Sequence, residues 1–234
     1  MAPAEFWFPV GAAALYLYDS ARLLWQNELV FQPARRGWQV LGGTELRLAG
    51  RRVFLPNPLL PHRPQFIVRW SQGDAIASAG AEVPAALLRV LRPIAVLNIL
   101  QVLLLLALPA ALWGLGTGLV ALAVFFLFYV LTLAALGLAW QRRAALRLPA
   151  RDYWALALDA LLCAPFAPNL TRKLAMRHGL DGEPLRFAAR HFDDAMLVRT
   201  RILVEARVRE EYADPDAAAR GAAILTNVLP RLMR

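Results

Sequence analysis

The chain has 234 residues, of which 59% are hydrophobic and only 18% are charged. A soluble domain has nearer half apolar and about a quarter charged residues, so lipid is expected to form part of the solvent. The net charge is +9, and Lys173 is the single lysine among 26 basic residues. Beside long apolar stretches, this basic balance favours an anionic membrane surface over nucleic acid as the partner. The abundance of Arg, Ala, Gly and Pro is typical of a GC-rich bacterial genome.

The N-terminal segment, residues 1–25, is predicted to be a helix that either spans the membrane or lies in its interface. On a helix Trp7 and Trp25 would stand about 27 Å apart, which is close to one bilayer. Asp19 and Arg22 are spaced i,i+3, so they can pair on one helix face. We favour a span with the N-terminus outside.

Residues 26–92 are expected to be cytoplasmic and to contain a small β element. Short extended segments are predicted at 38–41 and 66–70, and a hairpin at 45–55 turns at Ala49-Gly50. Four prolines between 56 and 64 predict an extended linker. Such a sheet is marginal alone, so it should lean on the membrane helices or on a partner.

Residues 93–140 are predicted to form a transmembrane helical hairpin. The segments 94–113 and 119–140 contain no charged residue, and each is long enough to cross about 30 Å of hydrocarbon. Asn98 and Gln101 stand one turn apart within the first span, and their amides are expected to join helices within the protein or against a partner subunit. Basic residues flank the hairpin on both sides, which places both ends in the cytoplasm and at the anionic lipid headgroups. These are Arg89, Arg92, Arg142 and Arg143.

The remaining chain is divided into a basic linker with an interfacial or re-entrant segment, 141–170, and a cytoplasmic, mostly helical tail, 171–234. Asp159 and two prolines argue against a further span in the first part. In the tail, one helix is predicted from 184 to 212 and a second from Asp214 to about 228. The alternation of apolar and charged residues over 198–209 fits a strand, but helix is favoured there.

Few residues suggest chemistry. Asp159, Asp193 and Asp194 are weak candidates for catalysis, with Asp159 pairing to Arg172 or Arg177 as the structural alternative. On a helix His191 and Asp194 could share a metal ion, although a solvated acidic patch is the favoured interpretation. The single cysteine, Cys163, excludes an intrachain disulfide. No nucleotide-binding loop, nucleophile elbow or haem motif is present, so no cofactor is expected.

These features predict a mainly α, integral membrane protein with a small cytoplasmic β element and a helical tail. The favoured function is a bacterial inner-membrane anchor or accessory subunit that binds a protein partner through its cytoplasmic parts, without catalysis of its own. Two alternatives stay open. One is a membrane-bound enzyme that acts on a lipid or phosphorylated substrate at the inner headgroup layer. The other is a protomer of an oligomeric channel.

Overall fold

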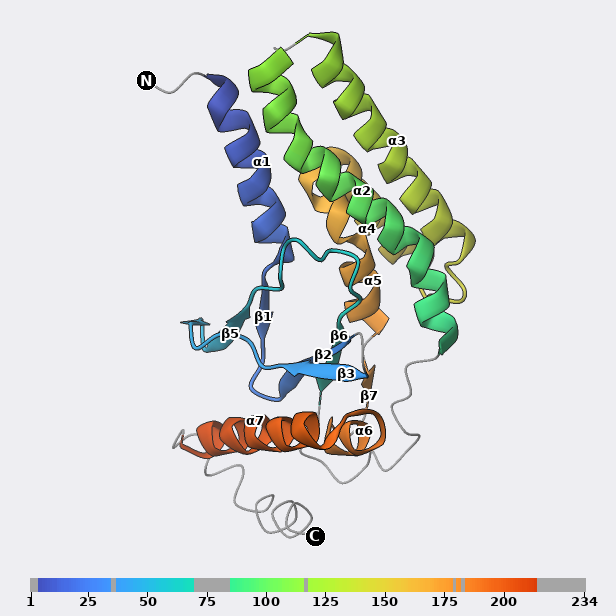
Figure 1. The fold of residues 1–234 in the computed structure, drawn as a ribbon. Coiled ribbons are helices and arrows are strands. Elements are labelled where there is room, and N and C mark those ends of the chain that lie inside the picture. Colours follow the sequence, from blue (N-terminus) through green and yellow to red (C-terminus); the bar gives the residue numbers. More distant parts are fainter. Residues whose placement is uncertain are drawn as a thin grey trace. The chain divides into compact units, whose positions relative to one another are not determined.

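The computed structural model describes residues 4–34, 37–69, 85–115, 118–178, 180–181 and 184–213, which form mostly helices with two small sheets (Figure 1). This confirms the prediction of a mainly helical protein with a small β element. The chain divides into two units, each assembled from three separate stretches. The helical unit comprises Met1–Arg22, Leu55–Phe66 and Val83–Gly179, and the α/β unit comprises Leu23–Phe54, Ile67–Glu82 and Leu180–Arg234.

The hairpin consists of α2 (Ala85–Leu115) and α3 (Leu119–Gln141), which lie side by side (Figure 1). Both helices are long and apolar enough to cross a membrane, and only 28% and 22% of the residues in their most apolar segments are buried. The core helix of a soluble protein would be mostly buried, so this exposure disfavours a soluble hairpin. The first helix starts earlier than the expected 93, because α2 continues without a break through Pro93.

The N-terminal helix is shorter than expected. Helix α1 (Ala4–Ser20) ends before strand β1 (Arg22–Leu24), so the predicted helix from Trp7 to Trp25 is wrong. The expected pair between Asp19 and Arg22 is also wrong, because Arg22 is part of the strand and Asp19 bonds to Lys173 instead. Helix α1 has 17 residues, or about 25 Å at 1.5 Å per residue.

The segment after the hairpin folds back onto it. Helix α4 (Ala150–Leu162) has 13 residues, too few to cross a bilayer. The Tyr153 hydroxyl of α4 donates to Leu136 O at 3.3 Å, and the Tyr129 hydroxyl of α3 donates to Leu161 O at 3.2 Å. Each helix thus donates one hydrogen bond to the other. A 3₁₀ helix, η1 (Ala164–Asn169), follows where the prolines interrupt the α-helix, and α5 (Leu170–His178) completes the unit.

The α/β unit contains short strands in two sheets. The first sheet has the order β3-β2-β6-β7, with β2 (Glu28–Pro33), β3 (Trp38–Leu41), β6 (Phe66–Arg69) and β7 (Leu180–Asp181). The second has the order β1-β5-β4, with β4 (Arg47–Leu48) and β5 (Arg51–Phe54). The expected turn joins β4 to β5, with positive φ of 51° at Ala49 and 74° at Gly50. Strands β1, β2 and β7 were not predicted.

Residues 184–213 form two helices, where a single helix was expected over 184–212. Helix α6 (Pro184–His191) ends before Phe192, and α7 (Asp194–Ala213) starts again with Asp193 as its cap. The Asp193 Oδ1 accepts the Met196 N–H at 2.8 Å, which satisfies one free donor of the first turn. A single helix over 184–212 is therefore wrong, and so is the strand alternative for 198–209. The helix expected after Asp214 lies outside the described residues.

Aromatic rings hold α6 against the first sheet. The Phe31 ring lies 5.2 Å from the Phe187 ring and 5.0 Å from the Phe192 ring, and Phe187 meets Trp38 edge to face. Phe31 and Phe187 are almost fully buried. Each such aromatic residue contributes on the order of 1.5–3 kcal/mol on burial, so this contact supplies much of the core of a small unit.

Candidate functional site

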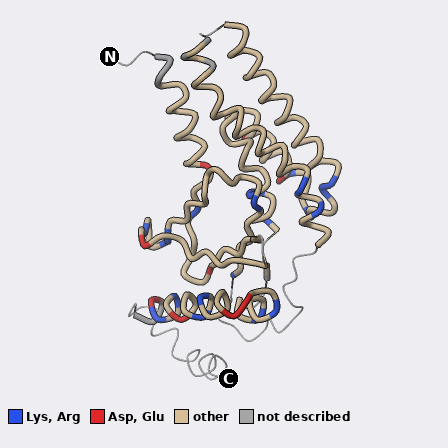
Figure 2. The backbone as a smooth tube through the Cα atoms, viewed as in Figure 1, with Lys and Arg blue, Asp and Glu red and all other residues tan. Residues whose placement is uncertain are grey.

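The four arginines predicted to meet lipid headgroups lie at one end of the hairpin. Figure 2 shows the hairpin helices free of charge over most of their length, with basic residues gathered at one end. The Arg142 Nη1 donates to Val90 O at 3.3 Å, which places the end of α3 beside the start of α2. The Arg143 guanidinium stacks over the Trp140 ring at 4.3 Å. Arg89 and Arg92 are exposed in the first turns of α2.

Asn98 and Gln101 lie inside the helical unit and are fully buried. The Gln101 Nε2 donates to Thr132 Oγ1 at 2.8 Å and links α2 to α3. The Asn98 Nδ2 donates to Thr171 Oγ1 at 3.0 Å and links α2 to α5. The structure therefore gives both amides partners on neighbouring helices of the same chain.

Asp159 is exposed on α4. The expected structural partners are engaged elsewhere: Arg177 pairs with Asp152 at 3.1 Å, and Arg172 bonds within the buried cluster described below. The predicted pairing of Asp159 with either arginine is therefore wrong.

The His191 and Asp194 pair does not have the predicted geometry. His191 ends α6 and Asp194 begins α7, so they are not one turn apart on a single helix. The His191 ring packs 4.5 Å from the Phe187 ring. Among the described residues, no group of three or more His, Cys, Asp or Glu side chains is placed to hold a metal ion. Asp193 serves as the helix cap, and Asp194 is exposed.

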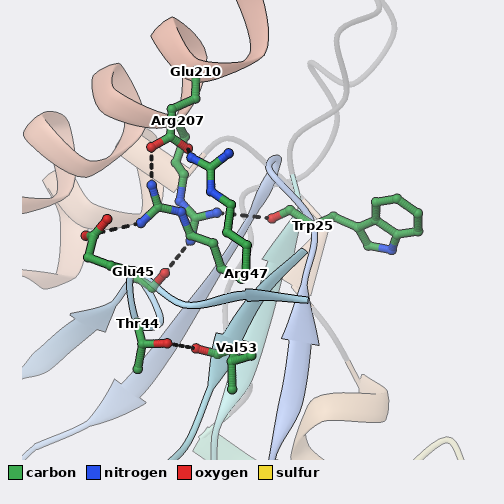
Figure 3. A network of polar contacts seen from close by, with 9 residues as sticks. Trp25, Thr44, Glu45, Arg47, Val53, Arg207 and Glu210 are labelled. Atoms are coloured by element: carbon green, nitrogen blue, oxygen red, sulfur yellow. Dashed lines mark hydrogen bonds and ion pairs between the residues drawn. The ribbon is translucent and has the colours of Figure 1, made fainter. Parts of the chain in front are cut away.

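A buried arginine fixes α7 in the α/β unit (Figure 3). The Arg207 side chain is 2% exposed and donates to the backbone carbonyls of Gly42 and Trp25, the latter at 3.5 Å. Burial, with the nearby charge of Arg52, lowers the pKa of Arg207 to about 10, so it stays protonated at neutral pH. One turn on, Glu210 forms ion pairs with Arg52 and with Arg47, the latter at 3.1 Å.

Two large apolar side chains of α7 are exposed. Val198 is 54% exposed and Ile202 is 60% exposed. With Ala195 and Ala206 they recur every three or four residues, so they form one apolar stripe along the helix. Arg199 and Arg201, both exposed, lie on either side of the stripe, and Arg209, which pairs with Glu205 at 3.7 Å, continues its line at the C-terminal end. We call residues 195, 198, 199, 201, 202 and 206 the α7 face.

The helical unit contains a buried ion pair that was not predicted. The Lys173 Nζ lies 2.7 Å from Asp19 Oδ1, and both side chains are less than one-tenth exposed. Asn169 Nδ2 donates to the other carboxylate oxygen of Asp19 at 3.0 Å, and the Lys173 ammonium also lies 4.9 Å from the Phe166 ring centre. The end of α1 is thus bound to η1 and α5.

Arg172 and Ser20 extend this group of buried polar residues. The Arg172 Nη1 and the Ser20 hydroxyl both donate to Asn169 Oδ1 at 3.1 Å, and Arg172 Nη2 donates to Asn57 O. The Arg172 side chain is 3% exposed, and burial lowers the pKa of its guanidinium. We call Asp19, Ser20, Asn169, Arg172 and Lys173 the polar cluster.

Two signals in the sequence point to this cluster. Lys173 is the single lysine of an arginine-rich chain, and Asp19 is the one acidic residue in the apolar stretch after Glu5. Neither signal identifies the partner, because Lys173 follows Asp19 by 154 positions in the sequence (173 − 19). Only the packing of α1 against η1 brings them together.

Comparisons with known proteins add no relative. No protein-family model matches the sequence, and neither the curated proteins nor the solved structures give a significant match.

Proposed function

We propose that the chain is a bacterial inner-membrane anchor or accessory subunit whose polar parts lie in the cytoplasm and bind a protein partner, with no catalysis of its own. The hairpin would hold the protein in the bilayer with the turn outside. The α/β unit would carry the α7 face to the partner. The observation that carries this proposal is that Arg207 and Glu210 fix one face of α7, while Val198 and Ile202 on the other face are left exposed.

Membrane anchoring is supported by the exposed apolar surface of α2 and α3. Leu103, Leu106 and Phe126 are each more than half exposed, which would be unfavourable in water over so many residues. The arginines at one end of the hairpin would face the anionic cytoplasmic leaflet. This orientation also leaves the uncharged turn outside.

The two alternatives receive less support. For an enzyme, a catalytic carboxylate would need to be free to act on a substrate, but Asp193 Oδ1 is used to cap α7. For a channel, polar residues should line a lumen between subunits. Gln101 and Thr132 instead bond to each other within one chain and are almost fully buried. Both observations favour the anchor.

The α7 face also indicates the chemistry of its partner. An apolar stripe between exposed arginines fits an amphipathic segment whose apolar residues are flanked by acidic ones. Burial of Ile202 in such an interface would contribute on the order of 1.5–3 kcal/mol. Arg199 and Arg201 would add charge complementarity at the rim.

The experiment is a pull-down of the tagged full-length protein from detergent-solubilised membranes, read by mass spectrometry. We expect a stoichiometric partner with the wild type and its loss with Ile202→Glu. Leu46→Glu is the matched control, because Leu46 is 67% exposed in the same unit but lies outside the α7 face. Equal partner recovery with both variants would contradict the assignment of the partner site to α7.

A further inference from the structure

Helix α4 runs antiparallel to the second hairpin helix, α3, and in step with it. The Tyr153 hydroxyl of α4 donates to Leu136 O at 3.3 Å, and the Tyr129 hydroxyl of α3 donates to Leu161 O at 3.2 Å. Eight positions on α4 (161 − 153) thus correspond to seven on α3 (136 − 129). The two helices therefore stay aligned along their length, at about 1.5 Å per residue.

Asp159 lies level with the middle of α3. It precedes Leu161 by two positions, so its counterpart on the antiparallel helix is close to residue 131. Helix α3 extends from Leu119 to Gln141, and residue 131 is next to its midpoint. If the hairpin spans the bilayer as proposed, the Asp159 carboxylate lies near the depth of the bilayer centre.

The start of α4 carries the residue types expected at the headgroup level. The Trp154 ring lies 5.9 Å from the Trp140 ring at the end of α3, and the Arg143 guanidinium stacks over Trp140 at 4.3 Å. Tryptophan and arginine side chains gather where hydrocarbon meets the headgroups. Asp159 is five positions beyond Trp154 (159 − 154), or about 7.5 Å deeper along the helix. An aspartate side chain is too short to return its carboxylate to the headgroups over that distance.

The Asp159 carboxylate is exposed and lacks a counter-ion in the part of the chain that the structure describes. It forms no ion pair with another described residue, and Arg177 is already paired with Asp152. Ala155 and Leu162 are also exposed, and at 100° per residue both lie within about 60° of Asp159 on the helix. Beyond Trp154, the exposed side of α4 is thus apolar except for one negative charge.

We propose that this exposed side of α4, residues 155, 158, 159 and 162, docks one transmembrane helix of a partner protein that carries a lysine or arginine near its middle. We call these four residues the α4 face. A carboxylate at this depth is costly in lipid, and a basic side chain would neutralise it. A second copy of the chain fits less well, because it would bring two carboxylates together. Ala155 is small, so the backbone of the partner helix could approach closely.

The inference rests on the proposed function, because only a protein in the bilayer would meet such a helix. It adds a contact within the bilayer, made by residues other than those of the α7 face. It also predicts the chemistry of the partner: a hydrophobic helix with a single basic residue that, without its counter-charge, would itself be unfavourable in lipid.

The test measures the association of the α4 face with synthetic transmembrane helices in phosphatidylcholine vesicles. Three leucine-rich peptides differ only in their central residue, which is lysine, leucine or glutamate, and each carries an acceptor dye at one end. The full-length protein carries a donor dye at Leu119→Cys in the Cys163→Ala background, because Leu119 is 83% exposed at the start of α3. Energy transfer at increasing peptide-to-lipid ratios gives the dissociation constant. We expect the lysine peptide to bind at least about tenfold more tightly than the leucine peptide.

Two substitutions of aspartate on the same helix locate the effect. Asp159→Asn should reduce the preference for the lysine peptide to less than about twofold, because the charge is removed while the shape is kept. Asp152→Asn is the matched control, because Asp152 lies in the first turn of α4 and pairs with Arg177, and it should keep the preference. Asp159→Lys should bind the glutamate peptide tightly, because the two charges are exchanged.

Several results would overturn the inference. These are equal binding of the lysine and leucine peptides to the wild type, a preference that survives Asp159→Asn, and a preference that Asp152→Asn also abolishes. Tightest binding of the glutamate peptide to the wild type would mean a carboxyl pair in place of a basic partner. Energy transfer between two labelled copies of the protein that Asp159→Asn removes would mean that a second copy occupies the face.

A separate label reports on the proposed function. Leu133 is 57% exposed on α3, and a bimane dye at Leu133→Cys in the Cys163→Ala background should be quenched by a lipid with a nitroxide in the middle of its acyl chain. Absence of quenching would contradict the membrane placement of the hairpin. Quenching together with no charge preference among the peptides would contradict the α4 face alone.

Discussion

Lys173 and Asp19 form an ion pair of 2.7 Å in which both side chains are less than one-tenth exposed. Asp19 lies in the last turn of α1, and Lys173 lies in α5. The pair therefore joins the first and last helices of the helical unit. The Asn169 amide holds the second carboxylate oxygen, which fixes the orientation of Asp19. The contact therefore determines where α1 is held.

Removal of one partner of this pair should destabilise the helical unit. Asp19→Asn leaves the Lys173 ammonium buried without a carboxylate, and we expect a loss on the order of 3–5 kcal/mol in unfolding free energy. The double variant Asp19→Asn/Lys173→Met should recover part of that loss. Thermal unfolding in detergent measures both. Asp152→Asn, which breaks a half-exposed pair, is the control and should cost under about 1 kcal/mol. A double variant as unstable as the sum of its single changes would contradict the coupling.

The hydrogen bond between Gln101 and Thr132 should contribute to helix association. A double-mutant cycle with Gln101→Leu and Thr132→Val is expected to give a coupling energy of about 0.5–2 kcal/mol. Thr132→Val leaves the buried Gln101 amide without its acceptor, whereas after Gln101→Leu the Thr132 hydroxyl keeps its bond to Phe128 O at 2.9 Å. Unfolding in micelles provides the four values. A coupling energy near zero would mean that this bond does not hold α2 to α3.

The α/β unit should depend on Arg207. Arg207→Met removes the donors to Gly42 O and Trp25 O. Trp25 O keeps the Glu28 N–H at 3.1 Å, so the loss of the buried donor to Gly42 O should dominate and cost about 1–3 kcal/mol. Hydrogen exchange read by mass spectrometry should then show lower protection in α7. The control is Arg209→Met, which removes an exposed i,i+4 pair with Glu205 and should change protection little. Equal loss of protection in both variants would argue against the special role of Arg207.

His62 should make the helical unit less stable in acid. Burial, with the charges of Arg63 and Arg172, lowers the pKa of His62 below its ordinary value of 6.5. The unfolded chain therefore binds a proton at a higher pH than the folded protein, and stability is complete above 6.5 and falls as the pH drops toward the folded pKa. Melting temperatures from about pH 8 to about pH 5 should fall less for His62→Gln than for the wild type. Parallel curves would contradict this role for His62.

The elements that depend on a short stretch of sequence could be predicted from it. The charge-free stretch before Arg142 predicts the hairpin, and Ala49-Gly50 predicts the turn between β4 and β5. Residues 198–209 form a helix and not a strand for two reasons. Asp193 caps the helix, and within the described part of the chain no second strand pairs with this segment. Val198 and Ile202 remain exposed while Val204 of the same alternation is buried, which is the scatter that a helix imposes on a period of two.

The contacts between distant segments could not be predicted. Strand β7 pairs with β6 across more than a hundred residues, and two residues carry no recognisable period. Asp19 has an arginine three residues on, so sequence alone favours the local pair with Arg22 over Lys173. The fold instead places Arg22 in a strand and pairs Asp19 with Lys173.

Cysteine accessibility in intact bacterial cells tests the central claim, that the hairpin spans the inner membrane with both ends inside. In the Cys163→Ala background, Leu115→Cys at the turn should react with a membrane-impermeant maleimide added outside. Leu46→Cys in the α/β unit should react only after lysis, although Leu46 is 67% exposed. The opposite pattern, or equal labelling of both cysteines before lysis, would contradict the proposed orientation.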